Sequence, residues 1–460
     1  MSYGNSLSRR LAGWCANYDM HFPEAAIVRA ETAIIDVVGC LLGGRNEAAV
    51  VNVGKFLRDA DSAGHAGAVT QGAGVGAPWA ALVNGCAAHA LDFDDNFFPA
   101  ITHASASLIP ALFALAEETG ASASAIVHAY IVGLEVEAQI GKLVNPAHYE
   151  SGWHATSTIG AIGTASACAV LLRLDAQGVL NAISIGSSLA GGSKNQFGSM
   201  VKPLHAGFAA MHGILAARLA AAGVAGVAET LQGKWSFAEL YAGASAGEGF
   251  VPVLFPEAPL AIDEYGLVAK LYPSCMSSHL GIDALLALRA KHVFDIQDIV
   301  SIDLHMPQFM VDNLRYQYPE SGAQARFSMN YCAAVALMDG VPRMAHFTED
   351  AIANLSPAMT RLLSLVHMHP KQAAPAAAAL PWGGDCMARI TLAGGRQIEQ
   401  QAMYPKGCQQ NPLTEQEQRE KFLDCARGKA SKTDADALFD KLKSFSRAEV
   451  LQDVFSSMRA

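Results

Sequence analysis

The sequence predicts a mainly α protein with a large all-helical domain and a smaller α+β domain. From residue 25 to 222 the chain is dominated by long runs of Ala, Gly, Leu, Ile and Val, and alternating strand patterns are nearly absent. Period-two alternation begins only after about residue 262. With 460 residues, of which 51% are hydrophobic, the chain is able to bury a large core.

The first half of the chain is expected to form a series of helices, each ending at glycine or at a polar break. Gly120, Gly178 and Gly223 suit helix C-termini, because glycine readily adopts the left-handed conformation found there. The expected helices cover residues 25–43, 105–119, 124–142, 155–173, 175–190 and 203–222.

One of these stretches is long and uncharged enough to be compared with a membrane-spanning helix. Residues 155–172 carry no charge, and their 18 positions reach the length that a membrane span requires. Five Ser and Thr residues lie among them. We therefore interpret the stretch as a helix buried in a soluble core, and we expect no membrane partner.

The α+β domain is expected over residues 263–404. The pair Gly394-Gly395 separates two alternating runs and predicts a β-hairpin. After this domain, residues 414–445 return to a charged amphipathic helix. The expected strands cover 301–306, 388–392 and 397–403, the helices between them 279–292 and 328–339, and a loop rich in Ala and Pro 373–381.

The charge balance argues against a nucleic-acid partner. There are 32 Lys and Arg against 42 Asp and Glu, a net charge of −10, whereas nucleic-acid binding relies on basic residues that neutralise phosphates. Charged residues make up only 16% of the chain, against a usual share of about 25%, which suggests a surface hidden in an oligomer.

Cysteine usage and the N-terminal segment favour a cytoplasmic protein. The nine cysteines show no CxxC spacing, and no signal peptide is visible. The glycine-rich run from Gly72 to Pro78 does not match the dinucleotide-binding pattern, and no phosphate-binding loop occurs elsewhere. We expect a protein that works without a nucleotide cofactor.

A first cluster of candidate residues holds three carboxylates, Asp92, Asp94 and Asp95, between His89 and His103. Like charges so close together repel one another, so stability alone does not explain them. Asp92 could act as a base or orient a histidine. Helix capping by solvated acids is one alternative. A Mg²⁺ site, or a metal-dependent hydrolase using the three acids and His103, is another.

His154 stands directly before the uncharged helix, at its expected N-terminus. The helix dipole lowers the pKa of a histidine there and favours the neutral imidazole that a general base requires. The same helix end attracts a carboxylate ligand. A capping or core histidine is the alternative interpretation.

Two lysines are candidates for binding an anionic substrate. Lys202 lies between apolar stretches, before Pro203, which is expected to open a helix, and it requires an anionic partner: a substrate carboxylate or an internal ion pair. Lys270 follows the expected domain boundary, where a cleft could bind a ligand, and it could clamp a substrate when the domains close. Cys275 is a weaker candidate nucleophile, because no activating base is marked in the sequence. Together, lysines, histidines and an acid suit proton abstraction from a carbon next to a carboxylate.

Several short segments, taken in order, resemble the MmgE/PrpD family, and together they cover nearly the whole chain. Each is weak by itself, but the ordered set is specific. The segments are AHALDFDD (88–95), GWH (152–154), KPLHAG (202–207), KLYPSC (270–275), RFSM (326–329), YPKG (404–407) and NPLT (411–414).

The resemblance implies a fold, an assembly and a site. The helical domain would be built from both chain ends, residues 1–262 and 405–460, with residues 263–404 as a lid. The protein would be a homodimer without a metal or organic cofactor. The catalytic residues would be Asp92, His103, His154, Lys202 and Lys270, with both lysines binding substrate carboxylates and with His205 and Tyr149 as further substrate-binding residues.

The family includes 2-methylcitrate dehydratase, cis-aconitate decarboxylase and iminodisuccinate epimerase. The resemblance therefore implies a cofactor-independent lyase, of the dehydratase or decarboxylase type, acting on a small di- or tricarboxylate. An isomerase or epimerase of a dicarboxylate is the first alternative, with Tyr149 as a second proton-transfer group near His154. A non-catalytic binding protein is the second.

This sequence departs from the decarboxylase pattern near the first cluster. Asn96 stands where the decarboxylases have Thr, and the stretch between Pro99 and His103 is one residue longer. Both differences weigh against decarboxylation of cis-aconitate itself.

Overall fold

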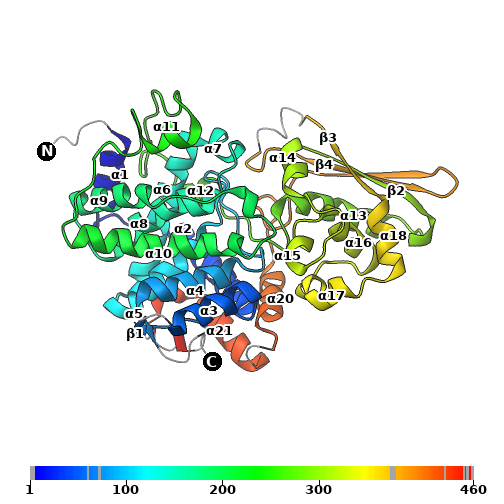
Figure 1. The fold of residues 1–460 in the computed structure, drawn as a ribbon, viewed down its shortest axis with the longest axis horizontal. Coiled ribbons are helices and arrows are strands. Elements are labelled where there is room, and N and C mark those ends of the chain that lie inside the picture. Colours follow the sequence, from blue (N-terminus) through cyan, green and yellow to red (C-terminus); the bar gives the residue numbers. More distant parts are fainter. Residues whose placement is uncertain are drawn as a thin grey trace.

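The computed structural model contains two bodies that lie side by side, one purely helical in its core and one containing a β-sheet (Figure 1). The structure describes residues 6–59, 62–70, 74–372, 380–428, 431–448, 451, 455 and 456. The expectation of a mainly α protein with a smaller α+β part is confirmed.

The helical body is built around α8, of which every residue is buried. Helix α10 packs against α8 and α4, and α5 and α6 complete the centre. The elements of this part are α1 (Leu7–Cys15), α2 (Glu24–Gly44), α3 (Ala48–Asp59), β1 (Ala63–Ala66), α4 (Ala77–His89), α5 (Ala104–Thr119), α6 (Ala123–Val144), α7 (Ala147–Glu150), α8 (Ala155–Leu171), α9 (Ala176–Ser188), η1 (Lys194–Gln196), α10 (Val201–Ala221), α11 (Phe237–Ala242) and α12 (Ala261–Glu264).

Small residues allow the central helices to approach closely. Gly85 on α4 faces Gly207 on α10, and a Cβ added to Gly207 would lie 2.3 Å from the carbonyl oxygen of Leu82. Only glycine fits at such a backbone contact, because any side chain would force the two helices apart. This contact fixes the start of α10 relative to the end of α4.

The second body carries a four-stranded sheet in the order β3-β2-β4-β5. Strands β2 and β3 run parallel, while β4 pairs antiparallel with β2 and β5. Helices α13, α16 and α18 cover one face of the sheet (Figure 1). The elements are η2 (Met276–Ser278), α13 (His279–Lys291), η3 (Ile296–Asp298), β2 (Ile299–Met306), α14 (Gln308–Asn313), α15 (Gly322–Ala325), α16 (Met329–Met338), η4 (Met344–Phe347), α17 (Glu349–Ala353), α18 (Pro357–Leu365), β3 (Val366–Pro370), β4 (Cys386–Leu392) and β5 (Gln397–Ala402).

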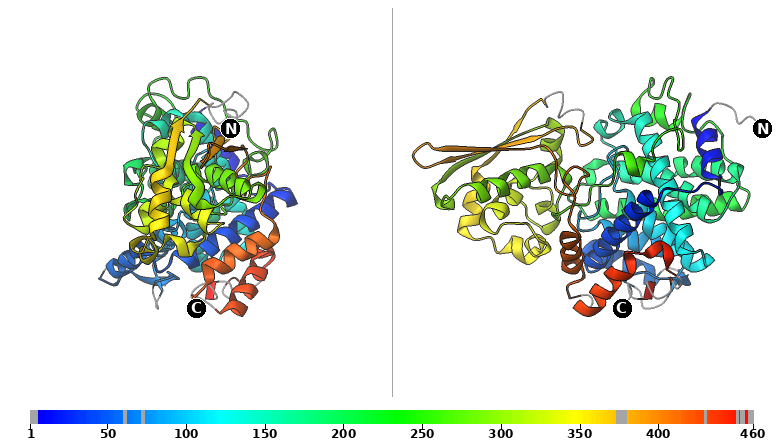
Figure 2. Two further views of the ribbon diagram at one scale, coloured as in Figure 1. Left: turned by 90° about the vertical axis from the view of Figure 1, so that its right-hand side faces the viewer. Right: turned by 180° about the vertical axis from the view of Figure 1, so that it is seen from behind.

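The C-terminal segment returns to the helical body (Figure 2). It contains α20 (Glu415–Ala426), α21 (Lys432–Leu442) and η5 (Phe445–Arg447). Helix α20 packs against α2, where the buried Lys421 Nζ lies 2.6 Å from Asp36 Oδ1. Thr414 and Glu417 form a capping box at its start, which satisfies backbone N–H groups that the helix leaves free.

Among the described residues, the two larger hydrophobic clusters match this arrangement. The larger draws its buried residues from 7–262 and from 422–455, and the smaller draws its residues from 197 and from 268–408. The proposed domain boundaries at 262/263 and 404/405 stay predictions. Among the described residues, no helix is long and apolar enough to cross a membrane.

Most expected elements are present, with a few corrections. Gly178 does not end a helix: it lies in the first turn of α9, where its N–H donates to the Asp175 side chain. The helix with Pro203 begins earlier, at Val201. The single helix expected over 414–445 is two helices. Residues 72 and 73 of the glycine-rich run and 373–379 of the Ala/Pro-rich loop lie outside the described residues.

Candidate active site

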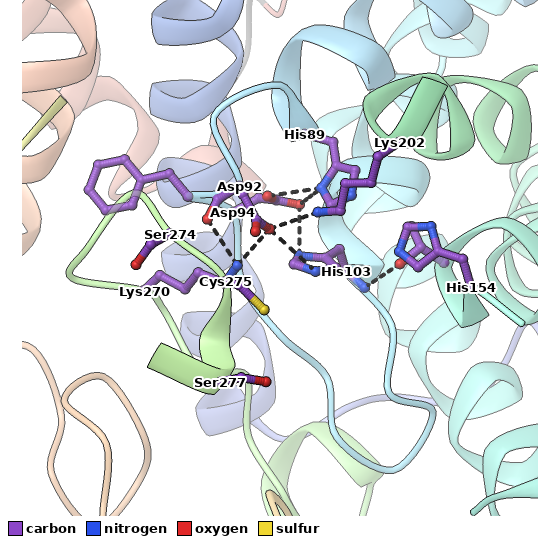
Figure 3. Close-up of polar contacts among 12 residues, drawn as sticks. His89, Asp92, Asp94, His103, His154, Lys202, Lys270, Ser274, Cys275 and Ser277 are labelled. Carbon is purple, nitrogen blue, oxygen red and sulfur yellow. Dashed lines mark hydrogen bonds and ion pairs between the residues drawn. The ribbon is translucent and has the colours of Figure 1, made fainter. Parts of the chain in front are cut away.

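A cavity of 420 Å³ lies where the two bodies meet. The helical body contributes Asp92, His103, His154 and Lys202 to its lining, and the second body contributes Cys275 among others. Figure 3 shows these side chains lying close to one another, with polar contacts that join Asp92, His103 and Lys202. Residues more than 180 positions apart in the sequence thus meet at a single charged end.

The loop between α4 and α5 ends at His103, and backbone hydrogen bonds join two of its own residues. Phe97 and Thr102 exchange two backbone hydrogen bonds with N–O distances of 2.8 and 3.2 Å. The Thr102 hydroxyl donates to the buried carboxyl of Glu137 at 2.6 Å. The backbone N–H of His103 donates to Thr156 Oγ1 at 3.0 Å. These bonds hold the loop on the helices behind it and so position the His103 ring.

Asp92 is held by both lysines that the sequence singled out. Its Oδ1 accepts from Lys202 Nζ at 2.7 Å and from Lys270 Nζ at 2.9 Å, and Lys270 also donates to the Asp92 backbone oxygen at 2.9 Å. Burial alone would raise the pKa of this carboxyl, but the two ammonium groups outweigh it and hold the pKa well below 3.8. Asp92 therefore stays ionised. Its φ of 50° is a left-handed conformation that costs about 1 kcal/mol or more outside glycine, so the surrounding bonds must maintain it.

Asp94 lies between two histidine rings. Its Oδ2 is 2.8 Å from His89 Nδ1 and 3.2 Å from His103 Nδ1. A carboxylate beside Nδ1 favours the tautomer with the proton on that nitrogen, which leaves Nε2 as the acceptor. Burial lowers the pKa of His89 to about 3 against the opposing effect of Asp94, and burial also lowers the pKa of His103. Both rings are neutral at neutral pH.

His154 provides a second neutral imidazole in the same cavity. Its Nδ1 lies 2.9 Å from His205 Nδ1, and its ring packs edge-on against Phe197 with centroids 5.1 Å apart. Burial first, then His205 and Lys202, hold the pKa of His154 well below 6.5. With Nδ1 engaged by His205, Nε2 is the ring nitrogen left for a substrate.

Three helix N-termini meet at this end of the cavity. His103 is the N-cap of α5, His154 is the N-cap of α8, and Lys202 is the second residue of α10. Each helix N-terminus carries a partial positive charge of roughly half an electron. Together with the lysines, these ends favour an anionic ligand and disfavour protonation of the histidines.

Uncharged polar groups line another part of the cavity wall. Asn313 Nδ2 donates to Tyr149 Oη at 3.3 Å and to Ser277 Oγ at 3.1 Å. The buried side-chain oxygens of Asn313 and Asn96 have no partner in the part of the chain that the structure describes, so each is able to accept a hydrogen bond from a ligand. Burial raises the pKa of the Tyr149 hydroxyl, which stays protonated at neutral pH.

Cys275 lines the cavity but lacks the environment of a nucleophile. Burial raises the pKa of its thiol, and the Asp92 carboxylate acts in the same direction. A thiol that stays protonated reacts slowly, because the thiolate is the nucleophilic form.

The three acids of the expected cluster do not lie together: Asp92 and Asp94 contact the residues of the site, whereas Asp95 contacts Ser105. Asp95 is not among the residues that line the cavity: its carboxyl accepts from the Ser105 hydroxyl, and its pKa is raised to about 8, mainly by burial. The metal set of a hydrolase that includes Asp95 is therefore not formed. His89, Asp92, Asp94 and His103 do bring possible ligand atoms within 4.8 Å of one another. The two ammonium groups on Asp92 nevertheless oppose a cation there by charge repulsion.

Two of the predicted substrate-binding residues stand behind the cavity wall. Lys270 and His205 are not among the lining residues, since Lys270 is fully buried against Asp92 and His205 lies behind His154. Tyr149 does line the cavity. The sequence reasoning gave no separate role to His89 and Asn313, although His89 stood within the quoted cluster.

Comparison with known families agrees with this architecture. The MmgE/PrpD N-terminal domain model matches residues 9–248, and the MmgE/PrpD C-terminal domain model matches residues 272–443. The chain belongs to the MmgE/PrpD family. The resemblance inferred from the short segments is thereby confirmed.

Curated relatives of this MmgE/PrpD protein include several decarboxylases. Human cis-aconitate decarboxylase is 29% identical over 418 residues, which cover 87% of this chain and 84% of that protein. The mouse cis-aconitate decarboxylase is 30% identical over 357 residues, covering 75% and 70%. The cis-aconitate decarboxylase-like protein oryM of Aspergillus oryzae is 26% identical over 430 residues, covering 87% and 86%.

Proposed function

We propose that this protein is a lyase of the dehydratase or decarboxylase kind that acts on a small carboxylic acid through proton transfer at a carbon next to a carboxylate. The observation that carries the proposal is the pairing of two neutral histidines, His103 and His154, with the Lys202 ammonium group at one end of the cavity. The relatives named as cis-aconitate decarboxylases support the same reaction class.

Lys202 is proposed to bind a substrate carboxylate. Its Nζ is held by Asp92 at 2.7 Å and lies 5.4 Å from the centre of the Phe327 ring, so it points from a fixed position into an apolar surrounding. A charge fixed in a poorly hydrated site stabilises the enolate-like charge that develops when a bond to the adjacent carbon breaks. Lys270 is a positioning residue, because it acts on Asp92 from behind.

The histidines are proposed to move the proton. In each ring Nδ1 faces a protein partner, Asp94 for His103 and His205 for His154, and Nε2 is left for the substrate. In a decarboxylation, the carbon–carboxylate bond breaks, CO₂ leaves with the carboxyl carbon, and the electron pair stays on the substrate. The negative charge of the bound substrate raises the pKa of a neighbouring ring, which takes up a proton from water and then supplies it to that carbon. In a dehydration, a neutral ring removes the proton and hydroxide leaves with a proton as water.

An isomerase is the second candidate, because Tyr149 lines the same cavity as the two histidines. A protonated phenol on another wall is able to return a proton to a planar intermediate from a different side. In that case the product is the mirror-image acid and not an alkene.

The test is proton NMR in D₂O with purified protein and a panel of acids that includes cis-aconitate, citrate, 2-methylcitrate, malate and iminodisuccinate. A new alkene or loss of CO₂ supports a lyase. Deuterium at the carbon next to the carboxylate, with no net change in composition, supports an isomerase. If none of the acids exchanges or reacts, the proposal fails for these acids and a non-catalytic binding protein is favoured. Homodimer formation and a cytoplasmic location stay predictions from the sequence.

A further inference from the structure

Another part of the cavity wall is apolar and aromatic. Phe98 packs edge-on against Trp382 with ring centroids 6.0 Å apart, and a Cβ added to Gly383 would lie 3.3 Å from the Phe309 ring. The indole N–H of Trp382 donates to the Met403 carbonyl oxygen at 2.8 Å. The indole therefore has no free polar atom for a ligand.

These three aromatic side chains form what we call the aromatic wall: Phe98, Phe309 and Trp382, all of which line the cavity. Leu280 and Leu380 line the same cavity and add aliphatic surface. The wall combines the loop before α5, helix α14 and the segment that precedes β4, so it is contributed by both bodies. Nothing in a proton transfer next to a carboxylate requires this surface.

The charge on the cavity wall is small. Of the lining residues that the structure describes, Lys202 is the one with a side chain that is cationic at neutral pH, while Asp92 and Glu150 are acidic. The Lys270 ammonium group lies behind Asp92. A tricarboxylate would bring three negative charges to a site with two ammonium groups that already share one carboxylate. Fewer carboxylates and more apolar surface in the substrate would fit this wall better.

The size of the cavity leads to the same conclusion. Its 420 Å³ lies within the range of about 300–1,000 Å³ found for pockets that hold drug-sized ligands, which are larger than a six-carbon acid. A small acid bound at Lys202 would leave the aromatic wall in contact with water.

We infer that the substrate is a dicarboxylic acid carrying an apolar substituent several carbons long. The inference rests on the proposed function for the position of the carboxylate head, beside Lys202, His103 and His154. The apolar substituent lies against the aromatic wall. Asn96 lies in the loop that joins Asp92 to Phe98, and its buried side-chain oxygen, which has no partner among the described residues, accepts a hydrogen bond from a hydroxyl group next to the carboxylates.

Calorimetric titration of the full-length protein with succinate and with 2-ethyl-, 2-butyl- and 2-hexylsuccinate tests this directly. These saturated acids lack a leaving hydroxyl group, so binding is measured without dehydration. Each methylene group transferred from water to an apolar surface contributes about 0.8 kcal/mol, so Kd is expected to fall about fourfold per methylene until the cavity is full. A Kd that does not change along the series overturns the inference.

Substitutions in the wall test where the chain binds. Phe309→Ala is expected to reduce the gain in affinity per added methylene group. Leu380→Ala should have the same effect to a smaller extent, because it removes less apolar surface than Phe309→Ala. The matched control is Phe294→Ala, in the same body but outside the cavity lining. This variant should show the same gain in affinity per methylene group as the unsubstituted protein. If Phe309→Ala and Leu380→Ala, both folded by circular dichroism, keep the full gain, the aromatic wall is not the subsite and the inference is overturned.

The two proposals fail in different ways. If chain length tightens binding but no acid reacts or exchanges deuterium, the substrate-binding inference stands and the proposed lyase activity fails. If unsubstituted acids react, and alkylated acids bind and react no better, the lyase stands and the inference is overturned. For a reactive pair, kcat/KM for the alkylated acid should exceed that of its unsubstituted analogue by at least tenfold.

Discussion

At the scale of single residues, the site consists of one carboxylate that two lysines share and two rings that burial keeps neutral. Asp92, His103, His154 and Lys202 were candidates because they are charged or titratable residues within or next to apolar stretches of the sequence. The structure brings all four to one cavity. The sequence could not show that Lys270 acts through Asp92, because that pairing depends on a contact over 178 positions.

Removal of the Lys202 charge should affect chemistry more than folding. Lys202→Met keeps the length of the side chain but loses the group that neutralises substrate and transition state, so kcat should fall by about 10²- to 10³-fold. Steady-state kinetics with the reactive acid measure this, and circular dichroism checks the fold. Lys142→Met, at a half-exposed lysine beside Glu264 and outside the cavity lining, is the matched control and should retain the rate. Equal rates for both variants would remove Lys202 from the mechanism.

The pH dependence of kcat/KM should reflect the lowered pKa values of both rings. Burial lowers the pKa of His103 and of His154, so both stay neutral as the pH falls through 6.5, the ordinary value. The acid limb of kcat/KM should therefore have its midpoint below 6.5. At high pH the rate should decline before 10.5, because burial also lowers the pKa of Lys202. An acid midpoint at or above 6.5, in protein that is still folded, would contradict neutral buried rings.

At the scale of elements, secondary structure was predicted correctly where a single hydrophobic pattern, either a continuous apolar run or a strict alternation, extended over the whole helix or strand. Helix α8 was expected from uninterrupted small and apolar residues, and the β4–β5 hairpin from alternation around Gly394-Gly395; both are confirmed. Helix α4 and strand β3 were not predicted. Strand β3, with the sequence VHMHP, has no clean alternation and ends in proline, so its pairing with β2 depends on tertiary contacts.

The close contact between α4 and α10 should be sensitive to a single methyl group. Gly207→Ala would place a Cβ 2.3 Å from the Leu82 carbonyl oxygen, so the helices must separate. Overpacking of this kind costs about 1–3 kcal/mol of the free energy of unfolding, which urea denaturation measures. The shift also displaces Lys202, five residues earlier on α10, so kcat should fall. Gly191→Ala, where a Cβ meets nothing within 4 Å, should leave stability unchanged; a similar loss in both variants would refute the contact argument.

The support of the loop by Glu137 predicts a pH-dependent effect on stability. Burial raises the pKa of Glu137 from 4.5 to about 8, so the folded state keeps a proton that the unfolded state loses between those values. Its contribution to the free energy of unfolding is therefore present below pH 4.5 and is lost as the pH rises towards 8. Glu137→Gln retains an oxygen acceptor for Thr102 and cannot ionise.

The variant should thus gain stability relative to the natural protein by roughly 2 kcal/mol or more between pH 5 and pH 9, since each pKa unit corresponds to about 1.4 kcal/mol. Urea denaturation at both pH values measures the difference. Glu248→Gln, at an exposed position, should show no such change with pH. A Glu137→Gln effect that is the same at pH 5 and pH 9 would show that this carboxyl ionises normally.

At the scale of the whole molecule, the proposed function depends on a cavity that neither core contains by itself. The side chains proposed to act in catalysis at the cavity wall come from the helical body, while Ser277, Phe309 and Trp382 come from the second body. Sequence patterns and the family resemblance predicted the fold class and the charged end. They gave no signal for the aromatic wall, because Phe98 lies more than 200 residues from Phe309 and Trp382 and all three look like ordinary core positions in the sequence.

The central claim is that His103 and His154, which are neutral before substrate binds, transfer a proton to or from a carbon next to a carboxylate. The most direct measurement is the rate of deuterium incorporation from D₂O at that carbon, followed by proton NMR for the natural protein and for His103→Gln and His154→Gln. We expect incorporation by the natural protein and a rate at least about 100-fold lower in one or both variants. Incorporation at equal rates in all three folded proteins would contradict it.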